Sequence, residues 1–268
     1  MDKLESLKES ISRMGRVLVA FSGGVDSTFL LRVAHDALGD GALAATALTS
    51  SFPGKELEES KRLAALIGAR QVFVETHEMD QDAYRSNTPE RCYFCKGVLF
   101  EELEQVAEKE GCAEILYGET AEDRGDYRPG ARAAKERRVR APLAELGFTK
   151  LEIRRYSKDL GLPTWDKPSM ACLASRIPYG SGITPEKLKM VELAEDALRG
   201  LGLRQVRVRH HDSVARIEVD PKDFPELTRS PVRDLVVSRL KEIGYRFVTL
   251  DLQGYRMGSL NEELPRPS

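Results

Sequence analysis

Apolar side chains in the first part of the chain recur with two different spacings. Over residues 4–14 they lie three or four positions apart, which predicts an amphipathic helix that ends at Gly15. The continuous apolar run 17–21 predicts a buried strand, and the apolar stripe within residues 29–38 predicts a second helix soon after it. The chain therefore begins with helix, strand and helix.

The same alternation continues along the chain. Strand-like runs at 42–48, 71–75 and 115–117 are separated by helical patterns at 56–67 and 89–111. Strands that alternate with helices predict an α/β fold, in which a mostly parallel sheet has helices on both faces. Ligands bind such sheets beyond the carboxyl ends of the strands, so we expect the site in the loops that follow the strands.

The pattern changes after the fourth predicted strand. An arginine-rich segment, 124–140, and a predicted helix near 149–160 lead into a stretch rich in glycine and proline at 161–182. We place a domain boundary in this stretch, which divides the chain into a larger domain, 1–165, and a smaller one, 166–268.

The smaller domain has a different order of elements. Its segments predict helix, strand, strand, helix and strand, at residues 185–201, 205–210, 214–219, 231–243 and 247–252. This order predicts a small α+β C-terminal domain beside the α/β domain.

Composition and charge narrow the possible classes of function. The 268 residues carry 41 Lys and Arg against 43 Asp and Glu, for a net charge of −2. Such a balance predicts no general affinity for nucleic acid or for a membrane surface, so any basic site must be local. The charged N-terminal segment and the lack of an uncharged apolar run of about 18 residues predict a cytoplasmic protein.

A glycine-containing loop lies between the first predicted strand and the second predicted helix. Gly23 and Gly24 allow the backbone to turn tightly and to approach a ligand, and the N-terminus of the following helix attracts phosphate. Ser22 and Ser27 add hydroxyl donors. The loop has neither the Walker A pattern nor the dinucleotide fingerprint, and the alternative is an ordinary strand-to-helix turn.

A second loop, residues 117–130, follows the fourth predicted strand and can face the same ligand. Gly118 permits close approach, Asp123 and Asp126 can hold Mg²⁺ or ribose hydroxyls, and Arg128 can pair with a phosphate or carboxylate. We count the hydroxyl of Thr120 among the nucleotide contacts expected here. The alternative is a solvated turn.

Cysteines suggest a metal site. Cys92 and Cys95 are three residues apart, so their thiols point the same way in a helix, and Cys172 can supply a third ligand. Three thiolates leave one position open, which suits an iron–sulfur cluster with an exposed iron better than a closed structural zinc. Zinc with His77 remains an alternative, as do unconnected cysteines, and Cys112 is expected to pack as a small apolar residue.

Arginines in the smaller domain suggest an anion site. Arg207 and Arg209 alternate with valines in a predicted strand, so both guanidinium groups share one face and suit a phosphate or a dicarboxylate. The alternative is a solvated strand face. Arg176 lies near Cys172 in sequence, and a nearby cation lowers the pKa of a thiol and favours the nucleophilic thiolate.

Three glutamates are weaker candidates for acid–base catalysis or metal binding, with surface charge as the alternative in each case. They are Glu192, Glu195 and Glu226.

The segment SGGVDS, residues 22–27, resembles the PP-loop of the ATP pyrophosphatase superfamily. Members of this superfamily cleave ATP between the α- and β-phosphates, adenylate a substrate oxygen and release pyrophosphate. The resemblance implies that the loop holds the leaving pyrophosphate, that Mg²⁺ neutralises it, and that Asp26 helps to orient the metal.

Five segments together resemble the LarE family, ATP-dependent sulfur transferases of nickel-pincer nucleotide biosynthesis. In chain order they are SGGVDS, RCYFCK, GETAEDRGDYRPG, KPSMACLASRIPYG and VRVRHHDSVARIEV. The resemblance implies that ATP adenylates a carboxylate of a pyridinium dicarboxylate mononucleotide. A cysteine at the position of Cys172 then displaces AMP, and cleavage of a C–S bond leaves a thiocarboxylate. Ser175, Arg207 and Arg209 would bind the substrate.

The additional Cys92 and Cys95 resemble the three-cysteine branch of that family. This implies a [4Fe–4S] cluster on three thiolates that carries an extra sulfide, with Cys172 as an iron ligand. The family resemblance also implies a homo-oligomer, and the balanced charge predicts that nucleic acid is not a partner. One alternative is a PP-loop enzyme that thiolates tRNA through the Arg-rich segments; glutamine-dependent amidation is a weaker one. Another is a nucleotide-binding regulatory module with structural zinc.

Overall fold

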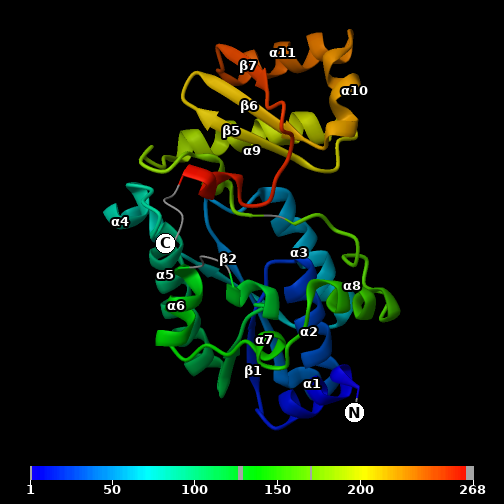
Figure 1. Ribbon diagram of the computed structural model, residues 1–268. Helices are drawn as coiled ribbons and strands as arrows, with labels where there is room; N and C mark the ends of the chain where they lie inside the picture. The colour runs from blue at the N-terminus through cyan, green and yellow to red at the C-terminus, as the bar shows by residue number, and fades with distance from the viewer. Residues whose placement is uncertain (1, 126–128, 170, 264–268) are drawn as a thin grey trace. The chain divides into compact units, whose positions relative to one another are not determined.

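The computed structural model describes residues 2–125, 129–169 and 171–263, and the chain forms two compact units (Figure 1). The first unit comprises Met1–Gln81 and Glu90–Met170, and the second comprises Asp82–Pro89 and Ala171–Ser268. In the described ranges no helix is both long and apolar enough to cross a membrane.

The first unit contains a four-stranded parallel sheet with the strand order β3-β2-β1-β4. The strands are β1 (Val17–Ala20), β2 (Ala42–Leu48), β3 (Gln71–Glu75) and β4 (Glu114–Leu116). The chain moves from β1 outward to β3 and then returns to the other side of β1. The order of strands therefore reverses at β1 and β4, and the crevice beyond their carboxyl ends is where such sheets bind ligands.

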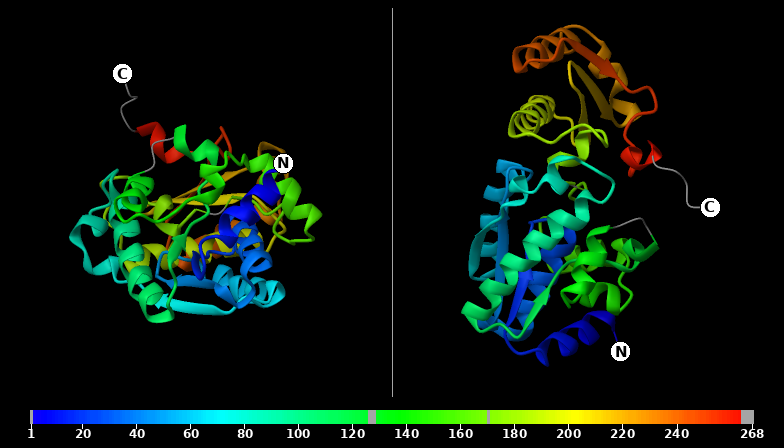
Figure 2. Two further views of the ribbon diagram at one scale, coloured as in Figure 1. Left: turned by 90° about the horizontal axis from the view of Figure 1, so that it is seen from below. Right: turned by 90° about the vertical axis from the view of Figure 1, so that its left-hand side faces the viewer.

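Helices cover both faces of this sheet (Figure 2). They are α1 (Lys3–Ser12), α2 (Val25–Leu38), α3 (Gly54–Ile67), α5 (Arg91–Glu110), α6 (Pro129–Glu136), α7 (Pro142–Glu145) and α8 (Lys150–Asp159), with short turns η1 (Gly39–Gly41), η2 (Glu78–Asp80) and η3 (Ala121–Gly125). The predicted parallel sheet with helices on both faces is confirmed.

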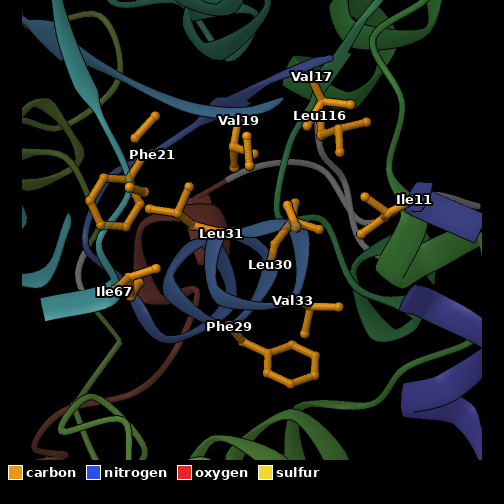
Figure 3. Close-up of a cluster of buried hydrophobic side chains, with 14 of the residues drawn as sticks. Ile11, Val17, Val19, Phe21, Phe29, Leu30, Leu31, Val33, Ile67 and Leu116 are labelled. Atoms are coloured by element: carbon orange, nitrogen blue, oxygen red, sulfur yellow. The ribbon is translucent and has the colours of Figure 1, made fainter. Parts of the chain in front are cut away.

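Side chains of β1 alternate between two hydrophobic cores. Val17 and Val19 pack with residues of α1 and α2, including Leu30 (Figure 3), whereas Leu18 packs with Phe100 of α5 on the opposite face. A strand that is buried on both faces is rigid, so the loop that follows β1 starts from a fixed position.

The second unit has a three-stranded mixed sheet with the order β5-β6-β7. The strands are β5 (Val206–His211), β6 (Val214–Val219) and β7 (Phe247–Leu250); β5 pairs antiparallel and β7 parallel with β6. The helices are α4 (Asp82–Arg85), α9 (Pro185–Arg199), α10 (Phe224–Thr228) and α11 (Val232–Ile243), with short turns η4 (Leu173–Arg176), η5 (Pro221–Asp223) and η6 (Ser259–Glu263). The predicted small α+β fold is confirmed.

A short segment from the first half of the chain, 82–89, belongs to the second unit. The buried side chain of Asn87 donates hydrogen bonds to the backbone carbonyls of Ile177, Pro178 and Ser181, at 3.1, 2.7 and 2.9 Å. The division of the structure therefore lies at residues 170 and 171 and includes this segment, whereas the boundary predicted from sequence lay at 165 and 166. Glycine and proline content cannot reveal hydrogen bonds between segments about ninety residues apart.

Candidate functional site

The phosphate loop, residues 22–27, joins the end of β1 to the first turn of α2. Gly23 has a φ of 70°, in the left-handed region, and a Cβ atom placed on it would lie 3.4 Å from the Cα of Ser60. Gly24 is the N-cap of α2 and has no side chain with which to cap the helix. The predicted glycine turn is confirmed, and the first N–H groups of α2 are the ones that can bind an anion.

Two hydroxyl groups hold the phosphate loop in shape. The Oγ atoms of Ser22 and Ser27 lie 3.2 Å apart, and the Ser27 hydroxyl also donates to the carbonyl of Gly24 at 3.3 Å. These bonds are long and therefore weak. A phosphate group could replace them with shorter, charge-assisted hydrogen bonds.

Asp26 lies in the first turn of α2 beside this loop. Its Oδ2 accepts a hydrogen bond from Nζ of Lys150, whereas its Oδ1 is buried and has no hydrogen-bond partner among the described residues. Burial raises the pKa of the Asp26 carboxyl above its ordinary value; the Lys150 ammonium opposes this, and the charge of Asp123 adds to it. A buried carboxylate oxygen without a partner is costly, and a Mg²⁺ ion would satisfy it.

The loop after β4 meets the phosphate loop at Gly118. A Cβ atom placed on Gly118 would come within 3.0 Å of the backbone nitrogen of Ser27 and 3.2 Å of the carbonyl carbon of Asp26. Only glycine allows this approach without a shift of the backbone. The expectation that the two loops share one edge of the sheet is therefore confirmed.

Asp123 and Thr120 organise the loop after β4 from within. Asp123 is buried, and its Oδ2 accepts hydrogen bonds of 2.9 Å from both the backbone N–H and the hydroxyl of Thr120. The ammonium of Lys150 lies 3.6 Å from the same oxygen. Their role in nucleotide binding stays a prediction, and Asp126 and Arg128 lie outside the described residues.

Sequence reasoning missed two lysines that contact the phosphate-loop region. Lys150, at the first turn of α8, pairs with Asp26 although 124 residues separate them, and Thr149 places it through a capping box with Glu152. Nζ of Lys167 donates to the carbonyl of Gly23 at 3.1 Å. Only the capping box was visible as a sequence signal, and it fixes where the helix begins, not what Lys150 contacts.

In the second unit, Cys172 is exposed and precedes the short turn η4. Its carbonyl oxygen accepts hydrogen bonds from the backbone N–H and the hydroxyl of Ser175, at 3.0 and 2.8 Å, and from Arg176 at 2.9 Å. The guanidinium of Arg176 thus binds the backbone at Cys172 and holds it in place. Its predicted effect on the thiol stays a prediction.

Arg176 and Glu195 form a fully buried ion pair. Nε and one terminal nitrogen of Arg176 donate to the two carboxylate oxygens at 2.7 and 3.0 Å, and the backbone N–H of Val208 donates to Oε1 at 3.1 Å. Burial raises the pKa of Glu195, but the charge and hydrogen bonds of Arg176 outweigh it, so the pKa lies below its ordinary value. The stability that this pair contributes is therefore lost as the pH falls through the lowered pKa.

The other two candidate glutamates have different surroundings. Glu192 accepts a hydrogen bond from Lys189 at 3.0 Å, and Glu226 is exposed on α10. Across residues 2–125, 129–169 and 171–263, no group of three or more His, Cys, Asp or Glu side chains is arranged to hold a metal ion. A role in metal binding or acid–base catalysis for Glu192, Glu195 or Glu226 stays a prediction.

Arg207 and Arg209 are buried, which excludes the solvated strand face. Arg209 donates to both carboxylate oxygens of Glu218, at 2.9 and 2.8 Å, and to the carbonyl of Ser175 at 2.7 Å. Arg207 lies with its guanidinium carbon 5.4 Å from the ring centroid of Tyr255. The valines were expected to be the buried face, but both faces of β5 are covered.

Several charged side chains are buried together in the second unit. Among the described residues around β5, the arginines Arg176, Arg207 and Arg209 are buried together with two carboxylates, Glu195 and Glu218. Burial and the neighbouring charge of Arg176 lower the pKa of Arg207 to about 10. Arg207 is still cationic at neutral pH.

The three cysteines of the predicted cluster are divided between the units. Cys92 and Cys95 lie in the first turns of α5, three residues apart and half-buried, and Cys172 belongs to the second unit. His77 is exposed at the start of η2. Burial raises the pKa of the Cys112 thiol, which keeps it protonated as a packing residue requires. The shared metal site stays a prediction.

Comparisons with known proteins place this geometry in a family. The chain is 45% identical over 264 residues to an uncharacterised protein of Synechocystis sp., with 98% of each chain covered. It is 36% identical over 265 residues to the pyridinium-3,5-bisthiocarboxylic acid mononucleotide synthase of Lactiplantibacillus plantarum, with 98% of this chain and 95% of the relative covered. It is also 29% identical to a glutamine-hydrolysing GMP synthase component of Archaeoglobus fulgidus, with 70% of this chain and 66% of the relative covered.

No family model matches the chain. The relatives nevertheless confirm the predicted resemblance, because the similarity to the pyridinium nucleotide synthase covers both units and the similarity to GMP synthase fits the PP-loop superfamily. The chain belongs to the LarE family, the family of the pyridinium-3,5-bisthiocarboxylic acid mononucleotide synthase.

Proposed function

We propose that this protein is an ATP-dependent sulfurtransferase that converts a carboxylate of a pyridinium-3,5-dicarboxylate mononucleotide into a thiocarboxylate. The observation that carries the proposal is the 36% identity to a synthase of that product over 98% of the chain. The contact of Gly118 with the start of α2 supports it, because two nucleotide-facing loops then meet beyond adjacent strands.

The first half of the reaction uses groups of the first unit. A carboxylate oxygen of the substrate attacks the α-phosphorus of ATP, the bond from this phosphorus to the bridging oxygen breaks, and pyrophosphate leaves. The phosphate loop and the N-terminus of α2 stabilise the pyrophosphate, and Lys150 supplies a further positive charge. Mg²⁺ fits Oδ1 of Asp26 and would neutralise the polyphosphate charge.

The second half uses the second unit. In one route, the thiolate of Cys172 attacks the acyl carbon, and the bond from that carbon to the AMP oxygen breaks. AMP departs, and the substrate is then joined to Cys172 as a thioester. Removal of the Cα proton and cleavage of the Cβ–S bond would then release the thiocarboxylate and leave dehydroalanine. The exposed position of Cys172, with its carbonyl held by Ser175 and Arg176, supports a thiol that is accessible and well placed.

Cys92 and Cys95 favour sulfide bound to an iron–sulfur cluster, and not the sulfur atom of Cys172, as the source of sulfur. Two half-buried thiols three residues apart on one helix are a ligand pair, and with Cys172 they would hold a [4Fe–4S] cluster that supplies sulfide. In that case Cys172 is a ligand that is preserved and not consumed.

Anaerobic reconstitution with iron and sulfide tests this source. We expect about one cluster per chain, by iron and sulfide analysis, and loss of both the cluster and repeated turnover after Cys92→Ala or Cys95→Ala, because a cluster needs each thiolate. Cys112→Ala is the matched control. Full turnover in the double variant Cys92→Ala/Cys95→Ala would reject the cluster.

The buried arginines are proposed to bind the substrate phosphate. Arg207→Met should raise the KM for the nucleotide substrate by roughly tenfold or more, because a charge-assisted hydrogen bond is worth about 1.5–3 kcal/mol. The KM for ATP should stay constant. Arg204→Met, which removes an exposed arginine just before the same strand, is the control. An unchanged KM for the nucleotide in Arg207→Met would remove this residue from the site.

Release of pyrophosphate tests the proposed function itself. With ATP and Mg²⁺, release should require the dicarboxylate nucleotide, because its carboxylate is the nucleophile. Pyrophosphate release that is independent of this nucleotide, or ATP binding without any release, would contradict the proposal.

A further inference from the structure

Lys167 is a half-buried cation that contacts the phosphate loop and two acidic side chains. Its Nζ donates to the carbonyl of Gly23 at 3.1 Å, to Glu56 at 2.7 Å and to Glu59 at 2.8 Å. Its side chain is only 11% exposed. Glu56 and Glu59 belong to α3, so one ammonium group joins the phosphate loop to this helix.

The backbone of Lys167 is fixed as firmly as its side chain. Arg154 of α8 donates from its two terminal nitrogens to the carbonyls of Trp165 and Lys167, at 2.7 and 2.8 Å. Arg154 lies one turn after Lys150, which contacts Asp26 of the phosphate loop. Helix α8 therefore holds the loop region at two points, once directly and once through Lys167.

Lys167 lies close to Cys172 along the chain. Cys172 follows Lys167 by five residues, so their Cα atoms are no more than about 18 Å apart even if the intervening chain is fully extended. After Cys172 in the chain comes Arg176, which forms a buried ion pair with Glu195 and donates a hydrogen bond to the carbonyl of Cys172. Only four residues separate Lys167 from Cys172 along the chain.

We propose that Lys167 is a positioning residue that couples nucleotide binding at the phosphate loop to the conformation of the Cys172 segment. The inference rests on the proposed function. Lys167 bonds the carbonyl of Gly23, the residue that gives the loop its left-handed turn, so a change in the loop on nucleotide binding acts directly on Lys167. Nucleotide bound to the phosphate loop thus positions the thiol of Cys172 before sulfur transfer.

The rate of alkylation of Cys172 tests this coupling. In a Cys92→Ser/Cys95→Ser/Cys112→Ser background, iodoacetamide reacts only with Cys172, and the rate is measured by intact mass with and without Mg²⁺ and α,β-methylene ATP. We expect the analogue to change the rate by about fivefold or more, which is a typical size for coupling between two sites. An unchanged rate at saturating analogue would overturn the coupling.

Variants of Lys167 separate coupling from simple shielding of the thiol by the nucleotide. Lys167→Met, assayed at a concentration of analogue that saturates it, should lose the change in rate, whereas shielding would persist in this variant. Lys167→Arg, which keeps the charge, should restore part of the change. Lys61→Met, an exposed lysine on α3, should behave as the parent protein.

The difference between the KM values for the two substrates is a readout that a general loss of structure would not produce. In otherwise unmodified enzyme, Lys167→Met should raise the KM for ATP by about tenfold and leave the KM for the dicarboxylate nucleotide unchanged. If Lys167→Met fails to fold, Lys167→Arg and the alkylation rates of the parent protein still decide the outcome. Nucleotide-dependent pyrophosphate release together with an unchanged alkylation rate would reject the coupling and leave the proposed function intact.

Discussion

Cys172→Ala is expected to abolish formation of the thiocarboxylate and to leave release of pyrophosphate largely unchanged. The reason is that, in the proposed mechanism, adenylation uses the phosphate loop, Asp26 and Lys150 of the first unit, whereas the sulfur step needs the thiol. Loss of a covalent nucleophile typically lowers a rate by about a thousandfold or more. The product is measured by mass spectrometry and pyrophosphate by a coupled assay in the same reaction.

The control for this variant is Cys112→Ala. Cys112 is half-buried before β4, and its pKa is raised by burial, so it should support neither step. Thiocarboxylate formed by Cys172→Ala at the rate of the unmodified enzyme would remove this cysteine from the reaction. Equal loss of both products would show instead that Cys172 also serves adenylation.

Asp26→Asn should lower pyrophosphate release by roughly a hundredfold to a thousandfold. An amide cannot supply the anionic oxygen that we propose holds Mg²⁺ against the polyphosphate, and loss of one preorganised electrostatic contact in an active site typically has this size. Activity is measured across a Mg²⁺ titration. Asp36→Asn, on the same helix but paired with Arg32 near the surface, is the matched control and should retain activity.

The raised pKa of Asp26 gives the same variant a pH signature. The folded protein holds the Asp26 proton more tightly than the unfolded chain does, so the contribution of this group to stability is present at low pH and is lost as the pH rises through the raised pKa. Asp26→Asn should therefore unfold at a higher temperature than the parent protein at neutral pH. A lower melting temperature, or no change, would contradict the claim that the buried Asp26 carboxylate lacks a partner for one of its oxygens.

Sequence patterns predicted the parts of the site that neighbouring residues determine. A buried strand, a glycine turn and an amphipathic helix specify the phosphate loop within about twenty residues of chain, and the structure shows all three in place. Gly118 was predicted for the same reason, because a loop that follows a parallel strand must emerge at the same edge of the sheet as its neighbours.

Contacts between distant segments could not be predicted in this way. Lys150 reaches Asp26 across 124 residues and Lys167 reaches Gly23 across 144, and neither lysine differs from a surface lysine in its local pattern. Burial of Arg207 and Arg209 was missed for a related reason. Alternation shows which side chains share a face of a strand, but Glu218 and Glu195, which balance most of their charge, lie on other elements.

The central claim is that the thiol of Cys172 acts on a substrate that is adenylated at the phosphate loop. It is tested most directly by fluorine NMR with a trifluoromethyl tag on Cys172, in the Cys92→Ser/Cys95→Ser/Cys112→Ser background. Paramagnetic Mn²⁺ bound with an ATP analogue should broaden the fluorine signal strongly, while Mg²⁺ with the same analogue should not. A signal that Mn²⁺ and the analogue leave sharp at saturation would place the thiol away from the nucleotide and contradict the account.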